Sequence, residues 1–285
     1  MVVLVTGANG QLGQAIQFIA KNHSEIQFVF CSSSELDISN EQNCKTIFSK
    51  YQPNYCINAA AYTAVDKAET ESEKAHAINV IGAKNLAEVC KANNTVLLHI
   101  STDFVFDGSK NSPYSETDNP NPTGVYGQTK LEGEIAIQNN WEKHFIIRTS
   151  WVYSQFGNNF LKTMLRLASE RDSLSVVNDQ IGTPTNAVDL AETLLAICEY
   201  HSQNQTKTIF GIYNFSNEGQ CSWFDFAQKI FEVNRITIEL NPIPMSNFPT
   251  PAKRPAYSVL DKSKIKEVFG LKIGTWEDSL TKASF

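Results

Sequence analysis

The chain has 285 residues, of which 42% are hydrophobic and 19% charged, a balance typical of a globular protein with one large α/β unit, or of a nucleotide-binding domain with a smaller companion. The net charge of −6 without a basic run argues against binding to nucleic acid, and no apolar run reaches the roughly 18 residues that span a membrane. Six cysteines without a C-x-x-C pair and five histidines without metal-ligand spacing predict a cytoplasmic protein with reduced thiols and no metal site.

The first half alternates short β-rich runs with longer helical patterns. This order predicts parallel strands joined by crossover helices, and therefore an α/β fold with a doubly wound parallel sheet. Residues 1–5 are expected to form the first strand, because this run is too short and lacks the basic flank of a secretion signal. The expected strands are 2–5, 26–30, 55–58, 96–100 and 145–148, and the expected helices are 11–21, 41–51, 72–93 and 126–139.

The pattern becomes less regular after residue 150. Helices are expected near 158–171, 187–201 and 223–234, and strands at 174–177 and 212–215. An extended loop is expected over 242–255, which carries five prolines. The sequence therefore predicts a nucleotide-binding domain over 1–150, to which the helix near 187–201 returns, and a smaller domain over 151–285 that covers the substrate.

A glycine-rich loop follows the first strand and opens the first helix. Gly7, Gly10 and Gly13 form a G-x-x-G-x-x-G spacing. Glycine allows a tight turn and the close approach of backbone to a pyrophosphate, which the free N–H groups of a helix N-terminus attract. A strand-to-helix turn without a ligand is the alternative, and the position within a strand–helix unit favours a dinucleotide cofactor.

The sequence leaves the choice between NADH and NADPH open. An acidic residue that binds the ribose is expected after the second strand, but residues 31–34 offer neither an acid nor an arginine. Asp37, with Ile38 after it, lies within reach of the adenine edge, and the alternative for Asp37 is a helix cap before Glu41. Small residues at 58–61, after the third strand, let a cofactor lie against the backbone or simply allow tight packing.

Tyr126 and Lys130 share one face of a predicted helix, because they are four residues apart. A free phenol titrates near pH 10, too high for efficient proton transfer at neutral pH. An ammonium about 4 Å away is expected to lower the pKa of Tyr126 by up to about 3 units. Tyr126 is therefore the candidate proton donor, with Lys130 as its cationic partner.

Ser101, Thr102 and Asp103 directly follow the predicted strand 96–100. The carboxyl end of such a strand is where ligands bind in doubly wound sheets. A hydroxyl there can stabilise the negative charge on a substrate oxygen. The alternative is a cap for the turn that follows. The Tyr126–Lys130 pair about 25 residues later favours the catalytic interpretation.

Taken together, these motifs resemble the extended short-chain dehydrogenase/reductase family over nearly the whole chain. The resemblance implies a Rossmann domain followed by a smaller C-terminal domain that binds a nucleotide sugar. The matching segments are 6–13, 58–69, 101–106, 126–133, 148–153, 157–160, 163–167, 179–184 and 249–255, and those of the second half are more specific than the glycine loop.

The resemblance implies NAD(P)H-dependent reduction of the C4 keto group of dTDP-4-dehydro-L-rhamnose to dTDP-L-rhamnose, a step towards cell-surface polysaccharides. Tyr126 would be the proton donor, Lys130 its partner and Thr102 the hydroxyl that contacts the sugar. Asp103 and Trp151 would also line the sugar site. The cofactor would contact Gly7, Gly10, Gln11, Leu12, Gly13, Asp37, Ile38, Ala61, Tyr62, Thr63, Tyr126 and Lys130.

Three further positions are candidates for the site. Asn79 matches an asparagine that supports the lysine in related reductases, and a buried polar residue that kinks the helix is the alternative. Lys253 and Arg254, on the proline-rich loop, are candidates to meet the substrate diphosphate, or belong to a solvated loop.

Some relatives bind Mg²⁺ through glutamates at a dimer contact. Val188 and Gln14 occupy the regions of two such glutamates, so the sequence does not support that site.

Two other functions remain open. An epimerase or dehydratase acting on nucleotide sugars would use the same cofactor half and return the hydride. A non-catalytic, reductase-like regulatory subunit of methionine adenosyltransferase would retain the fold. The expected partners are a small nucleotide-sugar substrate and, in a homodimer, a second copy of the chain; nucleic acid and membranes are not expected.

Overall fold

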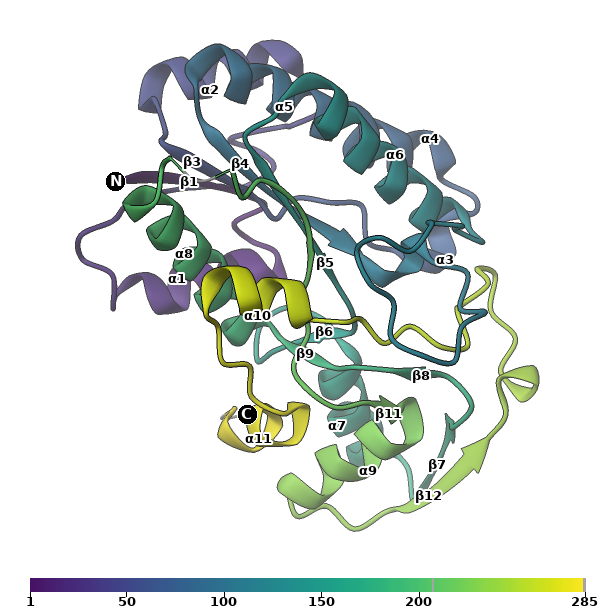
Figure 1. Ribbon diagram of the computed structural model, residues 1–285. Helices are drawn as coiled ribbons and strands as arrows, with labels where there is room; N and C mark the ends of the chain where they lie inside the picture. Colours follow the sequence, from purple (N-terminus) through teal and green to yellow (C-terminus); the bar gives the residue numbers. More distant parts are fainter. Residues whose placement is uncertain (207, 284–285) are drawn as a thin grey trace.

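A parallel six-stranded sheet forms the centre of the computed structural model, which describes residues 1–206 and 208–283 (Figure 1). The strand order is β10-β5-β4-β3-β1-β2, and every neighbouring pair is parallel. The predicted doubly wound α/β sheet is confirmed. The strands are β1 (Val2–Thr6), β2 (Gln27–Cys31), β3 (Tyr55–Asn58), β4 (Val96–Thr102), β5 (His144–Thr149) and β10 (Gly211–Asn214).

Helices cover both faces of this sheet because the apolar strands are buried on both sides. One face packs against α1 (Gln11–Ala20), α8 (Ala187–Gln203) and α10 (Ser263–Phe269). The other face packs against α2 (Glu41–Tyr51), α5 (Gly82–Asn93) and α6 (Val125–Asn140), which lie together at the top of Figure 1.

A third apolar cluster lies below the sheet in Figure 1. It is built from β6 (Val152–Tyr153), α7 (Phe160–Glu170), β7 (Ser173–Val177), β11 (Cys221–Ser222), α9 (Trp223–Val233), β12 (Glu239–Ile243) and α11 (Trp276–Lys282). The helix expected to return to the first domain, α8, packs on α1, and β10 and α10 also join the layers of the large sheet. The division of the chain into a cofactor domain and a substrate domain stays a prediction.

Two expected elements differ from the structure. The single helix expected over 72–93 is divided into α4 (Ser72–His76), a π-helical turn η1 (Ala77–Ile81) and α5. The loop expected from residue 242 starts later, because Pro242 and Ile243 still pair with β7 as the end of β12. The turn η3 (Met245–Asn247) follows. Short elements complete the chain: α3 (Val65–Ala68), η2 (Asp103–Val105), β8 (Ile181–Gly182) and β9 (Thr185–Asn186).

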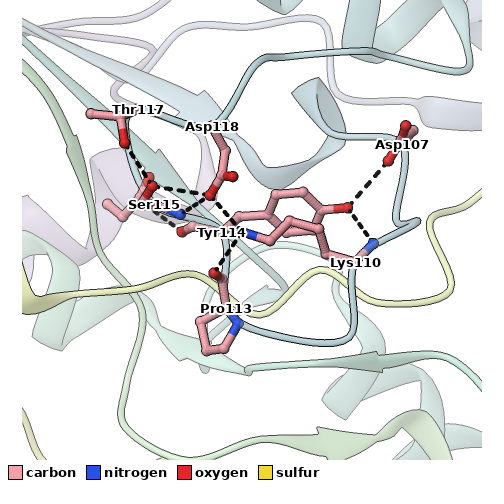
Figure 2. Close-up of polar contacts among 8 residues, drawn as sticks. Asp107, Lys110, Pro113, Tyr114, Ser115, Thr117 and Asp118 are labelled. Atoms are coloured by element: carbon pink, nitrogen blue, oxygen red, sulfur yellow. Dashed lines mark hydrogen bonds and ion pairs between the residues drawn. The ribbon is translucent and has the colours of Figure 1, made fainter.

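The loop between η2 and α6 is held by polar contacts within itself (Figure 2). Lys110 Nζ donates to Asp118 Oδ2 at 2.7 Å, and the Tyr114 hydroxyl donates to Asp107 Oδ1 at 3.2 Å. The Tyr114 backbone N–H donates to the Val259 carbonyl at 2.8 Å. The loop therefore fixes the segment around Val259 beside the end of β4. Among the residues that the structure describes, no helix has both the length and the apolar character needed to cross a bilayer.

Candidate active site

A cavity of about 560 Å³ opens at the carboxyl ends of β1, β3 and β4. The strand order reverses between β1 and β3, and ligands bind at such a switch point in doubly wound sheets. The cavity brings together ten of the residues predicted from the sequence: Gly10, Gln11, Leu12, Ala61, Thr63, Thr102, Asp103, Tyr126, Lys130 and Trp151.

The glycine loop forms the floor of one end of this cavity. Gly7 has φ +64°, and a Cβ there would lie 2.7 Å from the Ala60 backbone nitrogen. A Cβ on Gly13 would lie 2.4 Å from the Gly7 carbonyl oxygen. These two glycines therefore let the turn and α1 pack closely and do not line the cavity, whereas Gly10 does.

The start of α1 suits a pyrophosphate. Its N-cap residue, Gly10, provides no side-chain cap, so the first-turn N–H groups at the cavity have no side-chain acceptor there. Gln11 ties this turn to the second half of the chain: its Nε2 donates to the Val152 carbonyl at 3.1 Å, and its Oε1 accepts from Asn159 Nδ2 at 2.7 Å. Gln11 thus links the glycine loop to the segment after β5 through these hydrogen bonds.

Tyr126 lies at the start of α6, with its ring edge-on to Phe104 at 5.5 Å between centroids. The side chain is only partly covered by protein, yet the surrounding atoms desolvate the phenol. Burial raises the pKa of Tyr126 to about 12, a hydrogen bond with Thr102 opposes the shift, and the Asp103 charge adds to it. The prediction that Lys130 lowers the pKa of Tyr126 is therefore wrong for the chain alone, because the effect of desolvation on this pKa is larger.

Lys130 is buried on the same face of α6, one turn further on. Its Nζ donates to the Ile100 carbonyl at 2.6 Å and lies 3.3 Å from His99 Nε2. Burial lowers the pKa of Lys130 to about 8, and the Glu134 carboxylate opposes the shift. The ammonium is thus fixed by the end of β4 and lines the cavity beside Tyr126.

A buried polar chain lies behind Lys130. His99 Nδ1 lies 2.9 Å from Asn58 Nδ2, and Asn58 Oδ1 accepts from the Thr6 hydroxyl at 2.6 Å. Burial, followed by the charge of Lys130, holds the pKa of His99 well below its usual range. Sequence reasoning missed His99, because it lies within an apolar strand pattern and no local signal shows which helix it faces.

A second buried network, also missed, anchors the next turn of α6. Arg148 donates to Glu134 through Nε at 3.0 Å and Nη2 at 2.7 Å, and Glu134 accepts from the Ser101 hydroxyl. Both charged side chains are at most 2% exposed. Such a pair needs its geometry intact, because removing either partner would leave a buried charge unpaired. It holds α6 against the ends of β4 and β5.

Thr102 forms the cap that was considered for it and also lines the cavity, and its catalytic role stays a prediction. Its hydroxyl lines the cavity, accepts from the Phe104 N–H at 3.2 Å and donates to Asp103 Oδ1 at 3.0 Å. Asp103 is buried, and its Oδ2 has no hydrogen-bond partner within the described part of the chain. Burial raises the pKa of Asp103 to about 6, with hydrogen bonds from Ser258 and Thr102 opposing the shift. Asp103 Oδ2 is therefore suited to accept a hydrogen bond from a ligand in the cavity.

Three further predicted cofactor residues, besides Gly7 and Gly13, do not line the cavity. The Asp37 carboxylate accepts from Ser39, and Ile38 packs beneath Gly82 of α5. Tyr62 is buried, and its hydroxyl donates to Glu71 at 3.1 Å. After β2, where an acid that binds the ribose was expected, the Glu35 carboxylate accepts hydrogen bonds from the Ser32 N–H and hydroxyl.

Asn79 lies in the π-helical turn, a feature often found at functional sites. Its Oδ1 accepts from the Tyr62 N–H at 2.9 Å, and its Nδ2 donates to the Tyr62 carbonyl and to the Thr129 hydroxyl. One of these contacts is with Thr129, the residue before Lys130, and the expectation that Asn79 supports the lysine stays a prediction. Asn79 fastens the loop after β3 to α6.

Arg254 does not line this cavity but a second cavity of about 820 Å³. Its guanidinium forms a bidentate ion pair with Asp66, with distances of 2.9 and 2.8 Å. Lys253 next to it is exposed. The pair joins the proline-rich segment to the start of α3, close to the catalytic cavity, which Val65 lines.

The regions of Gln14 and Val188 do not fit a Mg²⁺ site. Gln14 Nε2 donates to the Asn9 carbonyl at 2.8 Å, and valine offers no ligand atom. Within residues 1–206 and 208–283, the three-residue group that brings metal-ligand atoms together is His23, Glu25 and Glu199, at different positions. Glu25 is exposed, and His23 and Glu199 are half-buried.

Comparison with known proteins places the chain in a defined family. Residues 1–284 match the family model described as the RmlD substrate binding domain. The chain is 44% identical to a dTDP-4-dehydrorhamnose reductase of Aggregatibacter actinomycetemcomitans, covering 98% of this chain and 96% of that protein. The crystal structure of a dTDP-4-dehydrorhamnose reductase from Clostridium acetobutylicum superposes with a TM-score of 0.93 at 41% identity, covering 99% and 98% of the two chains. The structure of the Bacillus anthracis enzyme in complex with NADP gives 0.91 at 39% identity, covering 98% and 96%.

Proposed function

The chain belongs to the RmlD substrate-binding-domain family, and from this premise we propose that it reduces the C4 keto group of dTDP-4-dehydro-L-rhamnose to dTDP-L-rhamnose with NADPH or NADH. The observation that carries the proposal is the cavity at the strand ends. It unites the glycine loop with Thr102, Tyr126 and Lys130. The loop proposed to bind the dinucleotide and the proposed proton donor therefore line the same cavity.

In the proposed reaction, Tyr126 donates its phenolic proton to the C4 oxygen. The bound cofactor supplies the hydride. With its pKa raised to about 12, the phenol is protonated at neutral pH, and its transfer of the proton depends on stabilisation of the phenolate that forms. Thr102 hydrogen-bonds the same oxygen and stabilises its developing charge. Lys130, fixed by the Ile100 carbonyl, stabilises the phenolate that remains.

The sugar would lie against Asp103 and Trp151 in the catalytic cavity. Asp103 Oδ2, which lacks a partner among the described residues, would accept a hydrogen bond from a sugar hydroxyl. The nucleotide would extend into the second cavity, where Arg254 is the proposed contact for the diphosphate. Gly7, Gly13, Asp37, Ile38 and Tyr62 would support the cofactor site from outside the catalytic cavity.

The proposal includes a cytoplasmic location and a homodimer. All six cysteines are free and buried, which suits a reducing compartment. Sedimentation of the purified chain tests the homodimer, since a monomer at all concentrations would refute it.

The direct test of the activity is to mix the purified chain with dTDP-4-dehydro-L-rhamnose and each reduced cofactor. Stoichiometric loss of cofactor absorbance and appearance of dTDP-L-rhamnose are expected. An epimerase or dehydratase would give no net consumption of cofactor, and a regulatory subunit would give no product. Either outcome would refute the proposal.

A further inference from the structure

We infer that Trp223 is a positioning residue for this reaction: it stacks on Trp151 and holds that ring at the catalytic cavity. The inference rests on the proposed function in one respect, namely that Trp151 borders the sugar. Trp223 belongs to α9, in the second half of the chain, and was expected only as part of an amphipathic helix.

The two indoles form the boundary between the two cavities. Their ring centroids are 3.5 Å apart, and their planes are within 10° of parallel. Trp151 lines the catalytic cavity together with Tyr126, whereas Trp223 lines the second cavity together with Arg254. A ligand that occupies both cavities would therefore contact this stack from either side.

Trp151 needs an external support, because its backbone is strained. Its φ of +47° lies in the left-handed region that a bulky side chain rarely adopts. Its ring also lies close to Gly182, where a Cβ would approach the indole to 2.5 Å. The ring is thus confined by the Gly182 backbone and the Trp223 ring.

Trp223 is itself held by local structure. It is the first residue of α9, directly after the N-cap Ser222, whose capping box with Asp225 has both hydrogen bonds present. The Phe160 ring of α7 packs against Trp223 at 4.6 Å between centroids. The position of α9 therefore determines where the Trp223 ring lies, and the Trp223 ring in turn holds the Trp151 ring at the catalytic cavity. Trp223 itself is not expected to contact the reacting atoms.

The test compares Trp223→Ala, Trp223→Phe and the control Trp276→Phe, which alters a buried tryptophan of the same apolar cluster outside both cavities. An aromatic pair of this kind stabilises by about 0.5–1.5 kcal/mol, so Trp223→Ala should raise KM for the sugar nucleotide or lower kcat by about two- to tenfold. KM for the cofactor should stay unchanged, and Trp223→Phe should restore most of the loss. Trp276→Phe should keep wild-type kinetics.

Two readouts do not require turnover. The near-ultraviolet circular dichroism of the stacked indoles should disappear in Trp223→Ala and persist in Trp276→Phe. A crystal structure of Trp223→Ala should show the Trp151 ring displaced. A ring that stays in place, or wild-type kinetics in Trp223→Ala, would overturn this inference and leave the proposed function standing. A wild-type chain without turnover would refute the proposed function, and the Trp151 ring position would still decide the positioning role.

Discussion

The Asp103 carboxyl group is almost fully buried at the wall of the catalytic cavity. In the folded chain its pKa is raised to about 6 from an ordinary 3.8, so the folded state binds more protons than the unfolded state between these values. Stability from this group is fully present below about pH 4 and is lost as the pH rises through about 6. The sign is the opposite of that for a surface carboxylate in an ion pair.

We therefore expect wild-type stability, relative to Asp103→Asn, to fall by about 2 kcal/mol between pH 4 and pH 7, because the shift is about two pKa units and part of the loss has already occurred at pH 4. Urea unfolding of both proteins at the two pH values measures this difference. Asp118→Asn is the control with the opposite sign, since the Lys110 hydrogen bond lowers the pKa of Asp118. A difference between wild type and Asp103→Asn that does not change with pH would contradict the account.

At the level of the secondary-structure element, α6 carries Tyr126 and Lys130, and its start is capped by a residue distant in the sequence. Its N-cap residue is Gly124, which offers no side chain, and Glu69 Oε1 accepts the Val125 N–H at 2.9 Å. A carboxylate at a helix N-terminus satisfies a free donor and interacts favourably with the helix dipole. Glu69 therefore fixes the turn that holds Tyr126.

Replacing this cap should destabilise the protein by a predictable amount. Glu69→Ala is expected to cost about 1 kcal/mol, and Glu69→Gln less, because the amide oxygen keeps the hydrogen bond without the charge. Glu132→Ala, on the same helix, is the control and should stay within about 0.5 kcal/mol of wild type. Chemical unfolding of the three variants measures the order, and equal stability of Glu69→Ala and Glu132→Ala would be evidence against the capping role.

Sequence reasoning succeeded for the elements whose signals are local. The i, i+4 spacing of Tyr126 and Lys130 and the position of Thr102 after an apolar strand were enough to bring these groups into one cavity. It did not predict the π-helical turn around Asn79, because that turn depends on hydrogen bonds to Tyr62 and α6. The pKa of Tyr126 was misjudged because the spacing of charges is visible in a sequence and desolvation is not.

At the level of the whole molecule, contacts between distant segments join the two halves. Asp66 and Arg254 are 188 residues apart, and no local pattern shows that they form an ion pair. The pair holds the proline-rich segment next to α3, between the two cavities. Because Asp66 is 38% exposed, solvent screens the pair, and its own contribution to stability is expected to be small.

A double-mutant cycle of Asp66→Asn and Arg254→Ala should give a coupling of about 0.2–1 kcal/mol in chemical unfolding. If Arg254 also meets the diphosphate, Arg254→Ala should raise KM for the sugar nucleotide by about 10- to 100-fold, since a hydrogen bond to a charged group is worth about 1.5–3 kcal/mol. The exposed neighbour Lys253→Ala is the control. An unchanged KM in Arg254→Ala would rule out the diphosphate contact.

The measurement that addresses the central claim is a single-turnover comparison of wild type with Tyr126→Phe, using dTDP-4-dehydro-L-rhamnose and saturating reduced cofactor. Loss of the phenolic proton donor should slow hydride transfer by about 10²–10⁴-fold, while the affinity for the cofactor changes little. If Tyr126→Phe turns over within tenfold of wild type, the proton comes from another group and the account of this site is wrong.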